Sequence, residues 1–269
     1  MKNFKFSFCV VCTVIKYNLF AQTTPIQHGH AHNDYVHARP LFEALENGFT
    51  SIEIDVHLYN NELKVAHDAI GLSSKPNIQQ LYLEPVKKII EQNGGSVYKN
   101  NHTLVVFMID FKTGGETYTK LKEILNNYRD IISVYQGDSV INEKAIRILI
   151  SGNAPLNEIL KEETSMATVD ADISALDDVK IDKAVTRYSS AWEGYFRWLG
   201  TGAMPQAQKN KLLALVAKAH SKKKQIRFYH IPDKPNVWKT LLDAGVDWIN
   251  TNKLKEFRKF WEQYNNITH

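Results

Sequence analysis

The chain has 269 residues, of which 43% are hydrophobic, 11% aromatic and 23% charged. This composition supplies the apolar side chains of a large core and excludes a disordered or collagen-like protein. The formal net charge is +4, but three lysines lie in the first 21 residues, where there is no acid, and without them 30 basic residues face 29 acidic ones. This balance gives no electrostatic reason to expect a nucleic-acid partner.

The first 21 residues have the pattern of a secretory signal peptide. Lys2 and Lys5 precede an apolar stretch over residues 6–15, and the small residue Ala21 suits cleavage. The stretch is too short to span a bilayer, which needs about 20 residues. We therefore expect a cleaved leader over residues 1–21, a secreted or periplasmic protein, and one domain over residues 22–269. A buried N-terminal helix is the alternative for the leader, and no later stretch has the length of a transmembrane segment.

After the leader, short apolar and β-branched runs alternate with amphipathic segments. The runs predicted to form strands are Ile26–His30, Thr50–His57, Thr103–Phe111, Ala145–Ile150, Ala167–Ala171, Lys183–Arg187, Gln225–Ile231 and Val246–Asn250. The segments predicted to form helices are Pro40–Asn47, Ile78–Gln92, Glu116–Tyr128, Pro205–Lys222, Asn236–Ala244 and Leu254–Tyr264. This alternation predicts an α/β fold of the (β/α)8 TIM-barrel type, with an open doubly wound sheet as the alternative. In a barrel, functional residues lie at the C-terminal ends of the strands.

Two acidic residues interrupt the second predicted strand. Glu53 and Asp55 are two positions apart, so their side chains point to the same face of the strand. Two buried carboxylates on one face repel each other unless a cation or hydrogen-bond donors compensate them. A divalent cation does this well, and ligation by oxygen alone favours Mg²⁺ or Ca²⁺ over Zn²⁺.

The third predicted strand ends in a similar way. Asp110 follows an apolar run, and it is a candidate for a third carboxylate ligand; Lys112 lies on the same face and is expected to neutralise an anionic ligand. Histidines close the neighbouring elements: His30 and His32 end the first strand, and His67 follows a short hairpin strand at residues 63–66. Two imidazoles beside a cation can act as base and acid at neutral pH.

Several motifs, in this order and spacing, resemble a known superfamily. They are HxHNDY near the start, PLFEAL with SIEIDV, AHD at 66–68 and DFKTG at 110–114. Together they resemble the phospholipase-C-like phosphodiesterases, within them the glycerophosphodiester phosphodiesterase and sphingomyelinase D groups, and most closely the family of altered inheritance of mitochondria protein 6. The resemblance continues through residues 191–205 and 241–252, and it implies a distorted (β/α)8 barrel.

The resemblance also implies roles for single residues. Glu53, Asp55 and Asp110 would bind one Mg²⁺ or Ca²⁺. The catalytic pair would be His67 with either His32 or His30: His32 if HND corresponds to the family's HRG, and His30 if the preceding GH pair is the anchor. The substrate-binding residues would be Lys112, on the phosphate, and His230, which stands where relatives often place a tryptophan.

These observations predict a metal-dependent phosphoric diester hydrolase acting on a small glycerophosphodiester or a phospholipid headgroup. The alternative is a catalytically silent barrel that binds phosphorylated ligands or a surface partner. A serine esterase is disfavoured because no GxSxG motif occurs, and nucleotide-binding glycine loops are also absent from the sequence.

Overall fold

The computed structural model describes residues 23–268, and in them eight parallel strands close into a barrel. The predicted signal peptide lies outside the described residues. The barrel strands are β1 (Ile26–Ala31), β2 (Phe49–Tyr59), β4 (Val105–Phe111), β7 (Ile146–Gly152), β8 (Ala167–Asp172), β9 (Val185–Ala191), β10 (Gln225–Tyr229) and β11 (Trp248–Thr251). Because β1 pairs with both β2 and β11, the sheet has no open end. The TIM barrel is therefore confirmed, and the open sheet was wrong.

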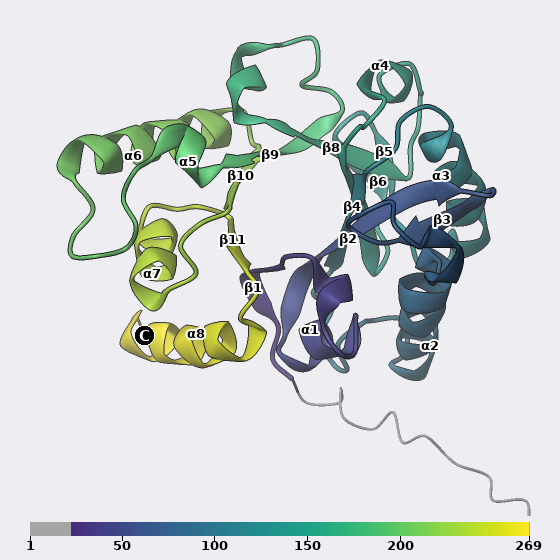
Figure 1. Cartoon of the computed structure of the whole chain (residues 1–269), viewed down its shortest axis with the longest axis horizontal. Helices are drawn as coiled ribbons and strands as arrows, with labels where there is room; N and C mark the ends of the chain where they lie inside the picture. Colours follow the sequence, from purple (N-terminus) through teal and green to yellow (C-terminus); the bar gives the residue numbers. More distant parts are fainter. Residues whose placement is uncertain (1–22, 269) are drawn as a thin grey trace, which may run out of the picture.

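The helices lie outside the ring of strands (Figure 1). They are α1 (Phe42–Glu46), α2 (Glu84–Gln92), α3 (Thr117–Leu125), α4 (Leu156–Ile159), α5 (Trp192–Tyr195), α6 (Gln206–Ser221), α7 (Pro235–Asp243) and α8 (Leu254–Thr268). Their apolar faces cover the strands: in α8, Phe257 is fully buried and its ring lies 5.7 Å from that of Phe49 in β2. No helix of the described chain is both long and apolar enough to cross a membrane.

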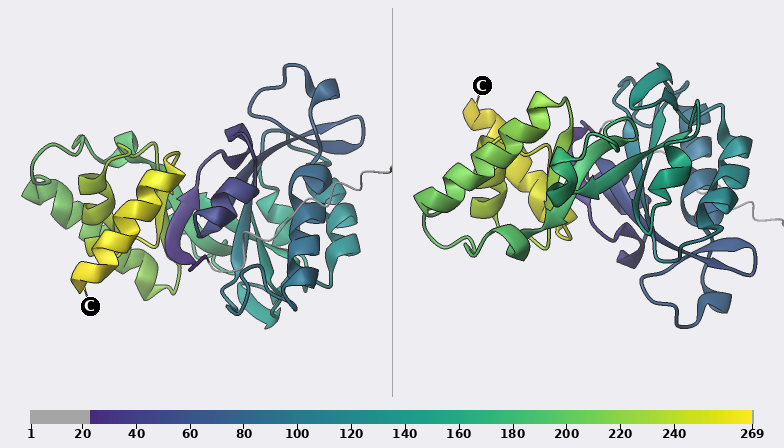
Figure 2. Two further views of the ribbon diagram at one scale, coloured as in Figure 1. Left: turned by 90° about the horizontal axis from the view of Figure 1, so that it is seen from below. Right: turned by 90° about the horizontal axis from the view of Figure 1, so that it is seen from above.

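Short elements lie between or beside the main strands and helices. Two of them fall within predicted helices: the π-helical turn η4 (Gln79–Leu83) within residues 78–92 and the 3₁₀ turn η5 (Asn126–Tyr128) within residues 116–128. The others were not predicted, namely the strands β5 (Val134–Gln136) and β6 (Ser139–Asn142) and the 3₁₀ turns η2 (Asp34–Val36), η3 (Leu72–Ser74) and η6 (Ile173–Asp177). The hairpin strand β3 (Glu62–Val65) pairs antiparallel with the end of β2. In both views of Figure 2 the blue segment around this hairpin projects from the body of the barrel. It places the residues after β3 beside the strand ends.

Candidate active site

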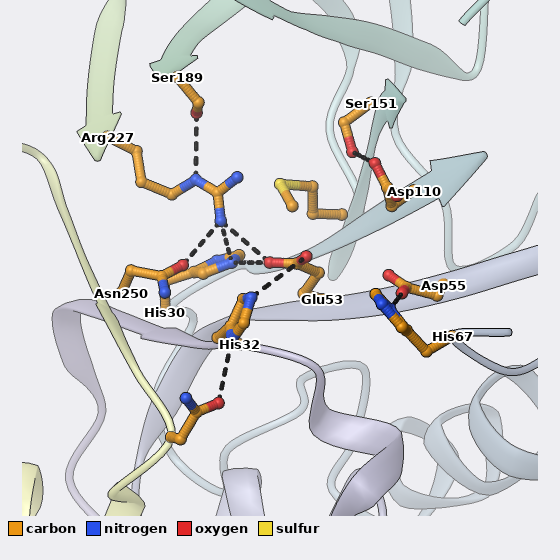
Figure 3. A network of polar contacts seen from close by, with 12 residues as sticks. His30, His32, Glu53, Asp55, His67, Asp110, Ser151, Ser189, Arg227 and Asn250 are labelled. Atoms are coloured by element: carbon orange, nitrogen blue, oxygen red, sulfur yellow. Dashed lines mark hydrogen bonds and ion pairs between the residues drawn. The ribbon is translucent and has the colours of Figure 1, made fainter. Parts of the chain in front are cut away.

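A pocket of about 570 Å³ opens at the C-terminal ends of the strands. Its lining includes most of the predicted site residues, namely His32, Glu53, His67, Asp110, Lys112 and His230. It also includes residues that were not predicted, among them Ser151, Asp170, Asp172, Ser189, Arg227 and Tyr229. Figure 3 shows how side chains from opposite sides of the barrel point toward this space. Because the C-terminal ends of all barrel strands lie on one side, residues as far apart in the sequence as His32 and His230, 198 positions, line the same pocket.

Asp55 and His67 form a hydrogen-bonded pair at one wall of the pocket. The Asp55 side chain is fully buried, and its Oδ2 lies 3.0 Å from His67 Nδ1. The β2–β3 hairpin fixes this contact, because the backbone N–H of Ala66 donates to the carbonyl of Asp55 at 3.2 Å. Since a carboxylate only accepts, His67 donates through Nδ1–H, and Nε2 is left for a substrate. The His67 side chain is 60% exposed, so a substrate can reach it.

The same oxygen of Asp55 accepts two further hydrogen bonds. The Tyr35 hydroxyl donates to Oδ2 at 2.7 Å, and Lys112 Nζ lies 2.9 Å from it. The other oxygen, Oδ1, is buried and has no hydrogen-bond partner among the described residues. One side of this carboxylate is therefore saturated with donors, and the other is free to bind a ligand.

Lys112 bridges two of the predicted metal ligands. Its Nζ lies 2.9 Å from Asp55 and 2.5 Å from Asp110, which also accepts a hydrogen bond from Ser151 at 2.7 Å. Partial burial would lower the pKa of Lys112, but the hydrogen bonds to the two carboxylates outweigh it and raise this pKa above its usual value. Lys112 is therefore a stable cation, and its charge compensates these acids.

Glu53 is paired with a cation that the sequence analysis did not consider. Arg227 Nη1 donates to Glu53 Oε2 at 3.0 Å and to Asn250 Oδ1 at 2.9 Å (Figure 3). Burial would raise the pKa of Glu53, but Arg227 and His30 outweigh it and hold this pKa well below the usual range. The carboxylate is therefore ionised, and the guanidinium neutralises it.

His30 and His32 occupy different layers of the barrel. His30 is fully buried, and burial, reinforced by Arg227, lowers its pKa well below the usual value. Its Nε2 lies 2.7 Å from Arg227 Nη1 and 2.9 Å from Glu53 Oε2, and its Nδ1 lies 2.7 Å from Ser51 Oγ. His32 lines the pocket, with Nδ1 2.9 Å from Asn252 Oδ1 and Nε2 4.0 Å from Glu53 Oε1. Only His32 is placed where a substrate can meet it.

His230 lies at the rim of the pocket. Its backbone has φ 54°, which turns the chain directly after β10, and its Nδ1 lies 3.1 Å from Glu193 Oε1. Its ring meets that of His32 edge-on, with centroids 6.4 Å apart. It is therefore close enough to the pocket to contact part of a bound molecule.

The chemistry of the carboxylates fits a divalent cation, but their present arrangement does not surround one. Within residues 23–268, no three His, Cys, Asp or Glu side chains are grouped so as to hold a metal ion. Protein cations compensate the acids instead: Lys112 pairs with Asp55 and Asp110, and Arg227 with Glu53. The unpartnered, buried Oδ1 of Asp55 is nevertheless the kind of hard oxygen ligand that Mg²⁺ and Ca²⁺ prefer.

The sequence analysis missed Arg227, although a signal for it exists. In β10, Arg227 lies between Ile226 and Phe228, which are both fully buried. Alternation along a strand puts Arg227 on the face opposite to these neighbours, which is the inside of the barrel. The argument that identified Glu53 and Asp55 would have identified Arg227 as well. Tyr35 gave no comparable signal, because it lies in a loop.

The closed barrel, with polar residues at the C-terminal ends of its strands, has the architecture of the TIM-barrel class. A glycerophosphodiester phosphodiesterase from Parabacteroides distasonis has the same fold, with a TM-score of 0.59, 15% sequence identity, and coverage of 90% of this chain and 100% of its own. The chain belongs to the family of AIM6-like phosphodiesterase domains, whose model matches residues 17–169. Residues 225–255 match the model of the glycerophosphoryl diester phosphodiesterase family.

Curated relatives agree with this assignment. The altered inheritance of mitochondria protein 6 of Eremothecium gossypii is 27% identical, over 86% of this chain and 68% of its own length. The homologue from Arthroderma benhamiae is 22% identical, over 86% of this chain and 83% of its own. The resemblance inferred from the sequence motifs is thus confirmed.

Proposed function

We propose that this protein is a metal-dependent phosphoric diester hydrolase of the glycerophosphodiesterase type. The observation that carries the proposal is the pair of accessible imidazoles, His32 and His67, on a pocket that also exposes Lys112. Membership of a phosphodiesterase-domain family supports the same reaction class. The proposed substrate is a small glycerophosphodiester or the headgroup of a phospholipid.

The two imidazoles divide the proton transfers of the proposed reaction between them. One ring removes the proton from the attacking oxygen, which belongs to water or to a neighbouring hydroxyl of the substrate, and the other ring protonates the leaving oxygen. Asp55 and Asn252 orient these rings by binding their Nδ1 atoms, so that each Nε2 is left for the substrate. Lys112 stabilises the negative charge on the non-bridging oxygens of the phosphodiester.

Glu53, Asp55 and Asp110 are the residues that we propose hold one divalent cation, Mg²⁺ or Ca²⁺. When bound, the ion would neutralise charge on the phosphate group. Lys112, which contacts Asp55 and Asp110, would share with the ion the neutralisation of these carboxylates. The unpartnered Oδ1 of Asp55 supports this assignment.

Hydrolysis of bis(p-nitrophenyl) phosphate tests the proposal. We expect turnover that a chelator abolishes and that Mg²⁺ or Ca²⁺ restores, and we expect His67→Ala and Asp55→Ala to be inactive. His102→Gln is the matched control, because His102 is exposed and lies outside the pocket. Full activity in either active-site variant would refute the assignment.

A barrel that binds phosphorylated ligands without turnover is the second candidate. The observation that favours it is the charge pairing, because Lys112 and Arg227 compensate all three acids without a metal ion. Saturable phosphate binding that Lys112→Ala weakens, together with no turnover on a broad panel of phosphodiesters, would establish this function.

We also propose that the protein is exported by its N-terminal segment. The support is the leader pattern of residues 1–21. The mature protein recovered from the periplasm or the medium should begin at Gln22. Recovery of the uncleaved chain from the cytoplasm alone would contradict export.

A further inference from the structure

A second cavity, of about 300 Å³, lies at the end of the barrel opposite to the candidate active site. Its lining comes from the first residues of the strands β4, β7, β8, β9, β10 and β11 and from the β5–β6 hairpin. The charged residues among them are Arg147, Arg187, Lys223 and Asp138. Three cations and one carboxylate therefore surround this space.

Arg187 is the most deeply buried of these cations. It is 1% exposed, its Nη1 donates to Ser51 Oγ at 3.3 Å, and its guanidinium stacks 4.6 Å from the ring of Trp248, which also lines the cavity. Its Nε is buried without a hydrogen-bond partner, and no ion pair joins it to a carboxylate of residues 23–268. The carboxylates of Asp170, Asp247 and Glu53 act on Arg187 only from beyond ion-pair distance, and a buried guanidinium without a direct ion pair is costly. This group therefore favours an anionic ligand.

The pKa of Arg187 is consistent with a buried guanidinium that has no direct ion pair. Burial lowers it to about 9, and the more distant Asp170 offsets only part of the effect. The local environment therefore disfavours the charge that the side chain carries at neutral pH.

The other lining residues leave the cavity with a net positive charge. Asp138 is already neutralised by Lys224, whose Nζ lies 2.5 Å from it. Arg147 pairs with Glu143 through Nη2 at 2.6 Å, but its Nε is buried and unpartnered. The hydroxyls of Thr168 and Thr186, 2.7 Å from each other, add hydrogen-bonding groups to the same lining.

We propose that this cavity binds a small oxyanion of the size of phosphate, held by the guanidinium groups of Arg187 and Arg147. Guanidinium groups present several N–H donors in a planar fork and match the oxygens of phosphate well. The site is separate from the candidate active site, and it does not depend on the function proposed for that pocket. The ligand is either free inorganic phosphate or a phosphomonoester, since the cavity admits both.

Phosphate binding measured by titration calorimetry and thermal unfolding, at constant ionic strength, tests the proposal. Lys112→Ala serves as the background, because phosphate also fits the candidate active site at Lys112. We expect phosphate, but not chloride, to raise the melting temperature of Lys112→Ala. Glycerol 3-phosphate, titrated in parallel, distinguishes a phosphomonoester from the free ion.

Two further substitutions localise the effect. Adding Arg187→Met to the background should abolish the shift while leaving the melting temperature in phosphate-free buffer unchanged or higher, because a buried unpaired charge is removed. Arg147→Gln, at a side chain 36% exposed, keeps the test available if the first variant does not fold, and it should weaken binding at least tenfold. An equal shift with chloride, or undiminished phosphate binding in Arg187→Met or in Arg147→Gln, would overturn the proposal.

Discussion

Tyr35 is one of the three donors on Asp55 Oδ2, beside His67 and Lys112. Its hydroxyl also lies 3.5 Å from His67 Nδ1, so it restrains both members of the pair. Tyr35→Phe keeps the ring and removes one hydrogen bond to a charged group, worth about 1.5–3 kcal/mol. We predict that kcat falls by about 10- to 100-fold while KM changes little, as measured by steady-state kinetics on a phosphodiester.

Tyr188→Phe is the control for this substitution. The Tyr188 hydroxyl also donates to an aspartate, Asp182, at 3.2 Å, but outside the pocket. The control should keep the wild-type kcat. If Tyr35→Phe also keeps it, Tyr35 has no positioning role.

The two histidines that end β1 should respond differently to the same change. His32→Gln is predicted to lower kcat by about 10²- to 10⁴-fold at unchanged stability, because it removes a proton-transfer group from an open pocket. His30→Gln alters the buried contacts with Arg227 and Ser51, and it should cost about 1–3 kcal/mol of unfolding free energy. Urea unfolding together with kinetics separates the two effects, and the opposite pattern would exchange the proposed roles.

The loop between β1 and α1 is anchored by a single buried carboxylate. Asp34 Oδ2 accepts from Leu41 N at 2.6 Å and from the Tyr82 hydroxyl at 2.9 Å, and Leu41 has φ 65°. Positive φ is unusual for leucine, so this anchor must hold the loop that carries His32 and Tyr35.

Asp34 makes stability depend on pH in a defined direction. Burial raises its pKa from 3.8 to about 6, despite the two donors that lower it. The folded state therefore binds this proton more tightly than the unfolded chain. The Asp34 contribution is favourable at low pH and is lost as pH rises from about 4 to about 6, at a cost of roughly 3 kcal/mol.

We predict that Asp34→Asn removes this component. The free energy of unfolding is measured for both proteins at several pH values. The wild-type value minus the variant value should decline between pH 4 and 6 and stay constant above pH 6. A constant difference across the range would show that Asp34 does not titrate there.

Gly152 ends β7 at a place where a larger residue does not fit. It has φ +68°, and a Cβ atom there would lie 2.6 Å from the Phe111 carbonyl and 2.8 Å from Asp110 Oδ1. Gly152→Ala should therefore destabilise the protein by on the order of 1–3 kcal/mol and reduce activity by displacing Asp110. Thermal unfolding and kinetics measure both, with Gly194→Ala, which meets no atom within 4 Å, as a control expected to be neutral.

For the whole molecule, the sequence predicted the barrel because each strand carries its own signal. A fully buried parallel strand is a short, continuous apolar run, and all eight predicted runs overlap observed strands, although the sixth, residues 183–187, begins two residues before β9 and ends four residues before the end of β9. The β5–β6 hairpin was not predicted because it is short and largely exposed, so its sequence lacks an apolar face. Only tertiary context defines such an element.

The candidate site, too, could be predicted from the sequence only in part. Single site residues, such as Glu53 and His67, could be found from local spacing, and the alternation in β10 could have indicated Arg227 as well. Their pairing could not be found: Arg227 is 174 positions from Glu53 in the chain, and their contact exists only because the barrel closes. The ion pair between Lys112 and Asp55 could not be predicted either. It joins the end of β4 to β2, and the sequence alone does not show which residues of two neighbouring strands lie side by side.

The order of contacts along the chain has a consequence for biosynthesis. Asp55 meets His67 across 12 positions, whereas His32 meets Asn252 across 220, through the last strand of the ring. A growing polypeptide can therefore form the Asp55–His67 contact early, but the His32–Asn252 contact must wait until β11 has been synthesised. If the proposed roles of the two histidines hold, the proposed activity would be absent until synthesis is nearly finished.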